Sequence, residues 1–194
     1  ATKLVHPLVN PQLLGLILIT DELRPTAINT FDFFKTQGVA LKVISGDDPI
    51  TVANIAKQAR LEGADQSVDM STIADNATAK DYQTLVKRYN VFGRVTPEQK
   101  KSLIMAYQAL GHTVAMTGDG VNDVLALRQS DCSIAMASGA DAASSIADFV
   151  LLDSNFDAMT GVLNEGRRVI NNIERVASMY LVKTMYSVIL ATIF

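Results

Sequence analysis

Short apolar runs alternate along this chain with longer amphipathic stretches, and residues typical of turns separate the two. The apolar runs predict strands over residues 13–19, 39–44, 90–93, 113–116, 132–136 and 149–152. Helices are predicted over residues 26–36, 49–62, 80–89, 97–110, 121–129 and 140–147, and residues 63–80 are predicted to be a loop with one helical turn. This alternation is typical of an α/β fold, in which helices cover both faces of a parallel sheet and ligands bind at the carboxyl ends of the strands.

The last part of the chain departs from this alternation, because a helical pattern without proline runs from about residue 156 to residue 194. Residues 176–194 contain a single charged side chain, that of Lys183. Within this part the apolar segment, residues 179–194, is shorter than the roughly 20 residues that cross a bilayer. We therefore expect a helix that leaves the globular part and begins a membrane span that continues beyond residue 194. Residues 1–10 lack the pattern of a signal peptide, and we expect a further segment before them.

Charge and cysteine content argue against two classes of protein. The 17 lysine and arginine residues against 20 aspartate and glutamate residues give a net charge of −3, so we expect no nucleic acid partner. The single Cys132 cannot form a disulfide within the chain, which favours the reducing cytoplasmic side of a membrane over a secreted protein.

Two of the predicted strands end in similar acidic turns that contain glycine. The first consists of Ser45, Gly46 and Asp47, where a hydroxyl and free backbone N–H groups at a helix start suit a phosphoryl group. A simpler interpretation is also open, because serine, glycine and aspartate are the residues that ordinarily form turns and cap helices.

The second turn, residues 117–123, is more specific. Asp119 and Asp123 stand four residues apart at a helix start, where two carboxylates repel each other unless a cation lies nearby. Glycines on both sides of Asp119 let a ligand approach the backbone. Carboxylate oxygens suit Mg²⁺, which completes its coordination with phosphate and water. We therefore predict a magnesium or phosphate site at this turn.

A cation is needed to balance the charge of a transferring phosphate. Lys100 and Lys101 lie in the first turn of a helix whose start is marked by Thr96, Pro97 and Gln99. Either lysine is a candidate for this role. The alternative is that both lie on an exposed, solvated face of the helix.

These motifs resemble those of P-type cation-transporting ATPases over nearly the whole chain. Residues 117–123 match the family's T-G-D-G-V-N-D signature, and residues 91–100 resemble its F-A-R-x-x-P-x-x-K block, with Gly93 in place of the alanine. Residues 45–47 are similar to the T-G-D motif, residues 21–25 to the D-P-P-R hinge, and residues 171–173 to the start of the fifth transmembrane helix.

The resemblance implies a Rossmann-like fold of the haloacid dehalogenase type, which agrees with the alternation described above. It also implies roles for the first turn and the hinge. Ser45, Gly46 and Gly118 would hold the phosphoryl group, and Asp47 would order the ATP side of the site. The hinge to a nucleotide-binding domain would contain Asp21 and Arg24.

For the second turn the resemblance implies a magnesium-dependent phosphoryl transfer with ATP as the substrate. Lys100 would neutralise phosphate charge, and Asn122 would donate a hydrogen bond to a phosphate oxygen. Asp119 would coordinate Mg²⁺, and Asp123 would support the metal or its water. Both aspartates are thus candidates for the metal site, and Lys100, Asp119, Asn122 and Asp123 are candidates for catalysis.

The resemblance further implies that the chain is a piece of a longer protein. The family's D-K-T-G-T motif, whose aspartate accepts phosphate from ATP, is absent from residues 1–194. Residues 1–20 would be the end of the nucleotide-binding domain and the hinge strand. Residues 21–173 would be an incomplete phosphorylation domain, and residues 174–194 the start of the transmembrane helix. We expect this piece to be inactive alone.

The intact protein would be an ATP-driven cation pump that hydrolyses ATP through an aspartyl phosphate, with Ca²⁺ as the leading candidate cation. It would lie in a bacterial plasma membrane with residues 1–173 on the cytoplasmic side. Lys183 would be either an anchor at the membrane interface or a functional residue. Two alternatives are a soluble phosphatase of the same fold and a non-catalytic fragment that binds Mg²⁺ and phosphate.

Overall fold

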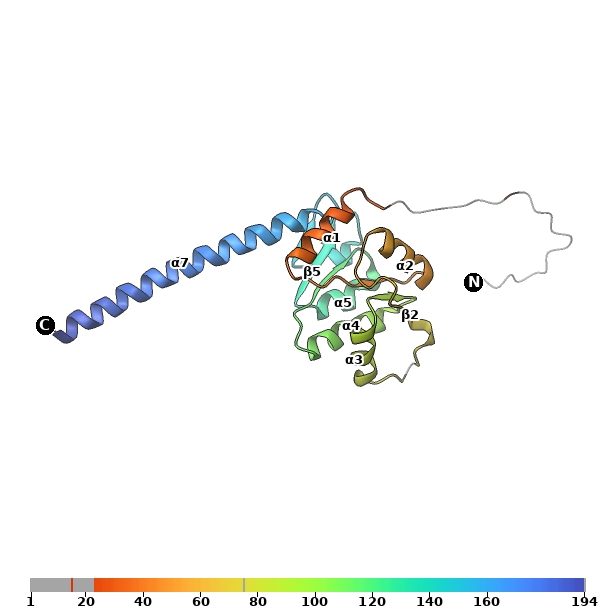
Figure 1. The fold of residues 1–194 in the computed structure, drawn as a ribbon, viewed down its shortest axis with the longest axis horizontal. Coiled ribbons are helices and arrows are strands. Elements are labelled where there is room, and N and C mark those ends of the chain that lie inside the picture. Colours follow the sequence, from red (N-terminus) through yellow and green to blue (C-terminus); the bar gives the residue numbers. More distant parts are fainter. Residues whose placement is uncertain (1–14, 16–22, 75, 194) are drawn as a thin grey trace.

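The computed structural model describes residue 15 and residues 23–74 and 76–193. These residues form a body of short strands and surrounding helices, from which one long helix projects (Figure 1). Of the strand predicted over residues 13–19, only Gly15 is described, and it belongs to no helix or strand. The rest of that strand and the predicted hinge residue Asp21 lie outside the described residues.

The first sheet contains three parallel strands in the order β1-β3-β2. They are β1 (Val43–Ile44), β2 (Ser67–Asp69) and β3 (Val91–Gly93). Successive side chains of β3 point to opposite faces. Val91 packs against α2 (Pro49–Gln58), and Phe92 packs against α3 (Ala79–Arg88) and α4 (Pro97–Ala109). Helices therefore cover both faces of this sheet, as the alternation predicts.

The second sheet is also parallel, in the order β4-β5-β6. Its strands are β4 (Ala115–Gly118), β5 (Cys132–Met136) and β6 (Phe149–Leu151). On one face Ala135 packs with α4, α5 (Val124–Gln129) and α6 (Asp141–Ser144), and on the other Ile134 packs with α1 (Ala27–Thr36) and the start of α7 (Ala158–Ile193). The predicted α/β class with parallel strands between helices is thus confirmed.

The strands are divided between two sheets, whereas a single sheet was expected. Val43 and Ser45 donate backbone hydrogen bonds to the carbonyl groups of Asn90 and Phe92, which lie in or beside β3. Hydrogen bonds alternate between the two sides of a strand, so the N–H group of Ile44 points away from β3. β1 and β4 are each the edge of their own sheet. Among the residues that the structure describes, each of these two strands therefore has one side without a partner strand.

Several local predictions differ from the structure: the helices predicted over residues 49–62 and 140–147 are shorter, as α2 and α6, and the strand predicted over residues 113–116 lies two residues later, as β4. The segment predicted as a loop contains β2 and the short 3₁₀ helix η1 (Met70–Thr72), and the strand predicted over residues 39–44 is reduced to β1. The helix predicted over residues 121–129 begins with a separate 3₁₀ turn, η2 (Val121–Asp123). That turn is tightened because the Asp123 side chain bonds back to the preceding loop.

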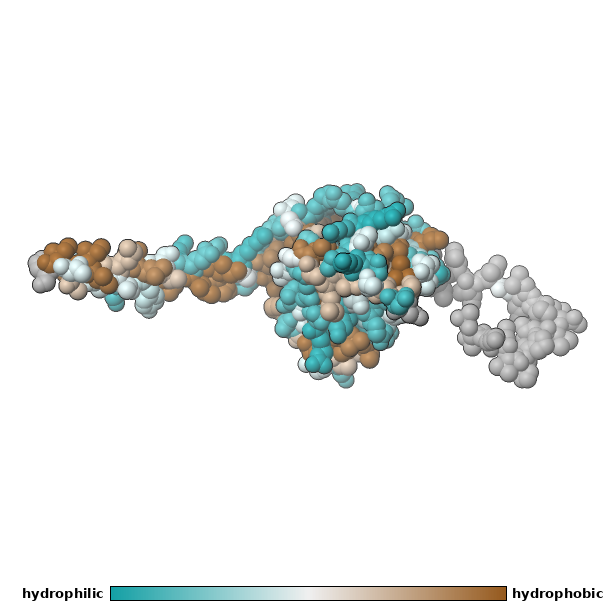
Figure 2. Space-filling view, turned by 90° about the horizontal axis from the view of Figure 1, so that it is seen from below, coloured by the Kyte–Doolittle hydropathy of each residue, from teal (hydrophilic) through white to brown (hydrophobic). Residues whose placement is uncertain are grey.

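Helix α7 spans 36 residues, and Met159 near its start is the buried residue within it. At 1.5 Å per residue it is about 54 Å long. Figure 2 shows apolar residues along much of this projecting helix, in contrast to the largely hydrophilic body. By length and composition it is the one helix among the described residues that could cross a membrane. The helix predicted to leave the globular part is thus present, and it begins at Ala158, two residues after position 156.

Candidate functional site

The turn after β1 is closed by hydrogen bonds of the Ser45 hydroxyl. This hydroxyl donates to Oδ2 of Asp47 at 3.0 Å and accepts from the backbone N–H group of Asp47 at 3.1 Å. Asp48 then caps α2, because its Oδ1 accepts from the N–H group of Ile50 at 3.0 Å. A Cβ atom added to Gly46 would meet no atom within 4 Å. The backbone at Gly46 is therefore open to a ligand.

The turn after β4 is built around the buried carboxylate of Asp123. Its Oδ2 accepts hydrogen bonds from the N–H groups of Asp119 and Gly120, at 3.3 and 3.2 Å. A Cβ atom on Gly118 would lie 2.5 Å from the Asp123 Cβ atom, so only glycine allows this close approach. The sequence motif thus contains a glycine here because the carboxylate folds back over it.

Lys100 extends from the first turn of α4 to the same carboxylate. Its Nζ lies 2.6 Å from Oδ1 of Asp123, and both side chains are about 10% exposed. Thr96 and Gln99 form the predicted capping box that begins α4. Lys101, the other candidate cation, is exposed. The structure therefore places Lys100, and not Lys101, beside the acidic turn.

The carboxylate of Asp119 is the available acidic group of the site. Asp119 is exposed, and among the described residues its side chain makes no hydrogen bond or ion pair. Its backbone is held in place, because the carbonyl oxygen accepts from the N–H group of Ala140 at 2.7 Å. A Cβ atom on Gly139 would lie 2.3 Å from that oxygen. Asp119 is thus fixed in position with its carboxylate free.

These groups surround one cavity of about 460 Å³ at the carboxyl ends of β1 and β4. Seven of the predicted site residues line it: Ser45, Gly46, Lys100, Gly118, Asp119, Asn122 and Asp123. Asp47 is not among the lining residues, since its carboxylate is turned to the Ser45 hydroxyl. Two turns that are more than 70 residues apart therefore contribute to a single site.

Arg24, predicted at a hinge, lies apart from the cavity. Its Nη1 donates to the carbonyl oxygen of Ser154 at 2.7 Å, in the loop between β6 and α7. Ser154 has a left-handed backbone, with φ of 48°. The contact joins the segment before α1 to the loop before α7, and the hinge role itself stays a prediction.

Several residues in or beside the site have no individual role in the predictions made from the sequence. Thr117 lines the cavity, and Gly139 supports Asp119 from the loop after β5. The signal for Gly139 was its place after a predicted strand, at the edge where ligands bind. Arg94 joins the loops beside the cavity through two ion pairs, described below. Its place in the motif of residues 91–100 singles it out in the sequence, but no local pattern indicates its partners.

The donor set fits a magnesium ion. Among the described residues no group of three or more histidine, cysteine, aspartate or glutamate side chains could hold a metal by itself. Mg²⁺ commonly takes only one or two carboxylates and completes its octahedron with phosphate and water. One free carboxylate beside a buried lysine and an open glycine backbone is therefore suited to Mg²⁺ bound together with a phosphate.

The chain is similar to known hydrolases and transport proteins. A family profile described as haloacid dehalogenase-like hydrolase matches residues 2–131. "Probable cation-transporting ATPase exp7" of Streptococcus pneumoniae is 47% identical over 182 residues, which cover 94% of this chain and 23% of that protein. "Calcium-transporting ATPase CtpE" of Mycolicibacterium smegmatis is 46% identical over 177 residues, covering 91% and 22%. The chain spans less than a quarter of the length of these relatives.

Solved structures share the fold at lower identity. The catalytic domain of the CPx-ATPase CopB-B superposes with a TM-score of 0.57 at 24% identity, over 74% of this chain and 46% of that chain. A zinc-transporting PIB-type ATPase in its E2.Pi state superposes with a TM-score of 0.62 at 24% identity, over 80% of this chain and 21% of that chain. Both agree with the architecture described above.

Proposed function

Because the chain belongs to the haloacid dehalogenase-like hydrolase family, we propose that it is the magnesium- and phosphate-binding part of the phosphorylation domain of a P-type cation pump. The relatives named above confirm the resemblance to cation-transporting ATPases. The observation that carries the proposal is the cavity, which brings the two predicted turns and Lys100 together. Phosphoryl transfer depends mainly on such positioning and on charge neutralisation.

The open edges of β1 and β4 support an aspartyl phosphate mechanism. We propose that a strand from another part of the longer protein lies between them and brings a nucleophilic aspartate to the cavity. An oxygen of this carboxylate would attack the γ-phosphorus of ATP. The new O–P bond would form as the bond to the bridging oxygen breaks, and ADP would leave with that electron pair. Water would later hydrolyse the acyl phosphate.

The residues of the chain would divide this work between them. The Gly46 N–H group and the Asn122 amide would donate hydrogen bonds to phosphoryl oxygens. The Ser45 hydroxyl has one proton, which it donates to Asp47, so it would donate a third hydrogen bond on turning from Asp47 to the phosphoryl group. Lys100 uses one of its three N–H groups on Asp123, which leaves two for the phosphoryl group. Asp119 would bind Mg²⁺, which supplies positive charge to the phosphate oxygens.

We assign Asp123 to holding the loop. Its two carboxylate oxygens already accept hydrogen bonds from Lys100 and from the backbone of Asp119 and Gly120. A direct metal bond to Asp123 would have to compete with these contacts. Asp119 would therefore be the direct magnesium ligand, with Asp123 fixing the loop that carries it.

The transported cation and the location of the protein belong to the same proposal. We propose Ca²⁺, because one of the similar proteins is described as a calcium-transporting ATPase. The body would lie on the cytoplasmic side of a bacterial plasma membrane, with the apolar part of α7 in the bilayer. Arg167, Arg168 and Arg175 precede that part, as expected at a cytoplasmic boundary. Lys183 would reach back to the interface as an anchor.

The exposed apolar surface of α7 favours a pump over a soluble phosphatase of the same fold. Large apolar side chains that follow residue 175 are 38–70% exposed, namely Val176, Met179, Tyr180, Leu181, Val182, Met185, Tyr186, Val188, Ile189, Leu190 and Ile193. A soluble protein rarely exposes so large an apolar surface. The soluble alternative is therefore disfavoured.

The test is the formation of an acid-stable phosphoenzyme in the intact pump. Wild-type protein should acquire label from radiolabelled ATP when Mg²⁺ and Ca²⁺ are present, and hydroxylamine should remove it as expected for an acyl phosphate. Asp119→Asn should lose the label at ordinary Mg²⁺ concentrations. Asp65→Asn is a matched control, since Asp65 is exposed and paired with Lys57 away from the cavity. Equal magnesium dependence in wild type and Asp119→Asn would overturn the assigned role.

A further inference from the structure

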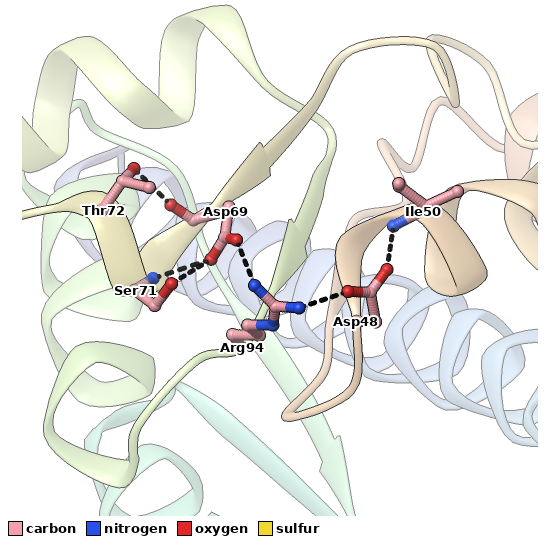
Figure 3. A network of polar contacts seen from close by, with 6 residues as sticks. All are labelled: Asp48, Ile50, Asp69, Ser71, Thr72 and Arg94. Carbon is pink, nitrogen blue, oxygen red and sulfur yellow. Dashed lines mark hydrogen bonds and ion pairs between the residues drawn. The ribbon is translucent and has the colours of Figure 1, made fainter. Parts of the chain in front are cut away.

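Arg94 joins the loops that follow all three strands of the first sheet. Its Nη2 lies 2.5 Å from Oδ2 of Asp48, after β1, and its Nη1 lies 2.7 Å from Oδ2 of Asp69, at the end of β2. Figure 3 shows the guanidinium group between the two carboxylates. Arg94 itself follows β3. The side chain therefore bridges loops that are distant in the sequence.

Each carboxylate also holds the start of the next helical element. Oδ1 of Asp48 accepts from the N–H group of Ile50 in α2, and Oδ1 of Asp69 accepts from the backbone and hydroxyl of Ser71 in η1 (Figure 3). The hydrogen bonds from Ser71 are the main cause that lowers the pKa of Asp69. Both acids are thus oriented for the guanidinium by contacts of their own.

The backbone of the same segment binds the Ser45–Asp47 turn. The N–H group of Arg94 donates to the carbonyl oxygen of Asp47 at 2.8 Å, and that of Val95 donates to the carbonyl oxygen of Ser45 at 3.0 Å. Arg94 adopts a left-handed conformation with φ of 51°, which is unfavourable for a residue with a side chain. Such a conformation persists where surrounding contacts over-determine it.

Gly93 allows the turn to come this close. A Cβ atom at this position would lie 2.5 Å from the Cα atom of Pro49, the first residue of α2. This close contact gives a physical reason for the glycine at the position where the resembling motif has alanine. The turn, the start of α2 and the end of β3 therefore form one tightly connected unit.

We propose that Arg94 is a positioning residue for the phosphate-binding turn, acting through Asp48 and through the backbone of Asp47. The inference rests on the proposed function, because it assumes that Ser45 and Gly46 bind a phosphoryl group. Arg94 is not among the residues that line the cavity, and both ends of its guanidinium are taken up by carboxylates. Its effect on phosphate is indirect.

Arginine is required for this geometry because its planar group can bind two separate carboxylates at once. A lysine ammonium is a single point of charge on a flexible chain and would hold one loop well at the expense of the other. Without the arginine, the carboxylates of Asp48 and Asp69 would lie on either side of the gap without a neutralising group. The turn would then open, and the Ser45 hydroxyl would lose its alignment.

The test compares phosphorylation of the intact pump by inorganic phosphate and by ATP. Formation of the acyl phosphate from inorganic phosphate is the reverse of its hydrolysis and needs no nucleotide. Arg94→Gln should raise the half-saturating phosphate concentration by about tenfold, equivalent to about 1.4 kcal/mol, and Arg94→Lys should give a smaller rise. Arg60→Gln is the matched control. Arg60 has a similar left-handed φ of 58° and no ion pair among the described residues.

A double-mutant cycle separates positioning from a general loss of structure. Asp48→Asn retains a side-chain oxygen that can cap α2 but loses the ion pair. Asp48→Asn and Arg94→Gln should therefore be strongly non-additive in their effect on the half-saturating phosphate concentration. Additive effects would overturn the proposal, as would an Arg94→Gln variant that weakens labelling from ATP alone. Absence of label in the wild type would instead contradict the proposed function.

Discussion

The buried pair between Lys100 and Asp123 makes a strong prediction about the stability of the body. Replacing Lys100 by methionine keeps most of the side-chain volume but leaves the Asp123 carboxylate without its cation. Both side chains are about 10% exposed, and the Nζ–Oδ1 distance is 2.6 Å. Breaking a buried ion pair on one side costs about 3–5 kcal/mol. Asp123 retains two backbone donors, so we expect a loss of about 3 kcal/mol in the free energy of unfolding, at the lower end of that range.

The measurement is urea unfolding of the 194-residue chain in a mild detergent, followed by circular dichroism. Lys101→Met is the matched control, since Lys101 is the next residue and is exposed. It should change the free energy of unfolding by no more than about 0.5 kcal/mol. A loss for Lys100→Met that equals the control would refute the reasoning, because the pair would then contribute no more than a solvated lysine does.

Two further predictions concern the support of Asp119 and the effect of acid. Gly139→Ala places a Cβ atom 2.3 Å from the Asp119 carbonyl oxygen, so Mg²⁺ affinity measured by calorimetry with inorganic phosphate present should fall by about tenfold or more. Gly161→Ala is the control, because a Cβ atom at that position meets nothing within 4 Å, and it should bind Mg²⁺ as tightly as the wild type does. Equal Mg²⁺ affinities for Gly139→Ala and Gly161→Ala would contradict the role of Gly139. Hydrogen bonds from the backbone and hydroxyl of Ser133 lower the pKa of Asp148 below its ordinary value of 3.8. The stabilisation by the ionised Asp148 is therefore present above pH 3.8 and is lost as the pH falls through the lower pKa of the folded state. In Asp148→Asn the free energy of unfolding should therefore fall less steeply with decreasing pH than in the wild type. An unchanged dependence on pH would contradict this prediction.

Much of the site could be predicted because its signals are local. Thr96, Pro97 and Gln99 mark the start of α4 by capping chemistry, and the structure has the complete capping box. Ser45 and Asp119 follow different parallel strands, whose carboxyl ends meet at one edge, so their convergence in one cavity follows from the alternation itself. The sequence pattern could also have distinguished Lys100 from Lys101. Lys100 shares a helix face with the buried Leu103 and Ile104, at spacings of three and four residues.

The remaining features depend on contacts between distant parts of the chain. β2 has three residues with one apolar side chain, Val68, and it is a strand because it pairs with β3. No local pattern predicts such a strand. The bridge from Arg94 to Asp69 was hidden for the same reason, since it requires that the loops after β2 and β3 lie together. The separation into two sheets likewise depends on which strand lies beside β1 and β4.

We propose that a further strand lies between β1 and β4 in the longer protein. Hydrogen exchange at the amide group of Ile44 tests it most directly, because that group points to the open edge of β1. We predict that it exchanges slowly in the intact pump and rapidly in the 194-residue chain. The amide groups of β3, which is paired on both sides, should be protected in both. Equally rapid exchange of the Ile44 amide in the two proteins would contradict the account.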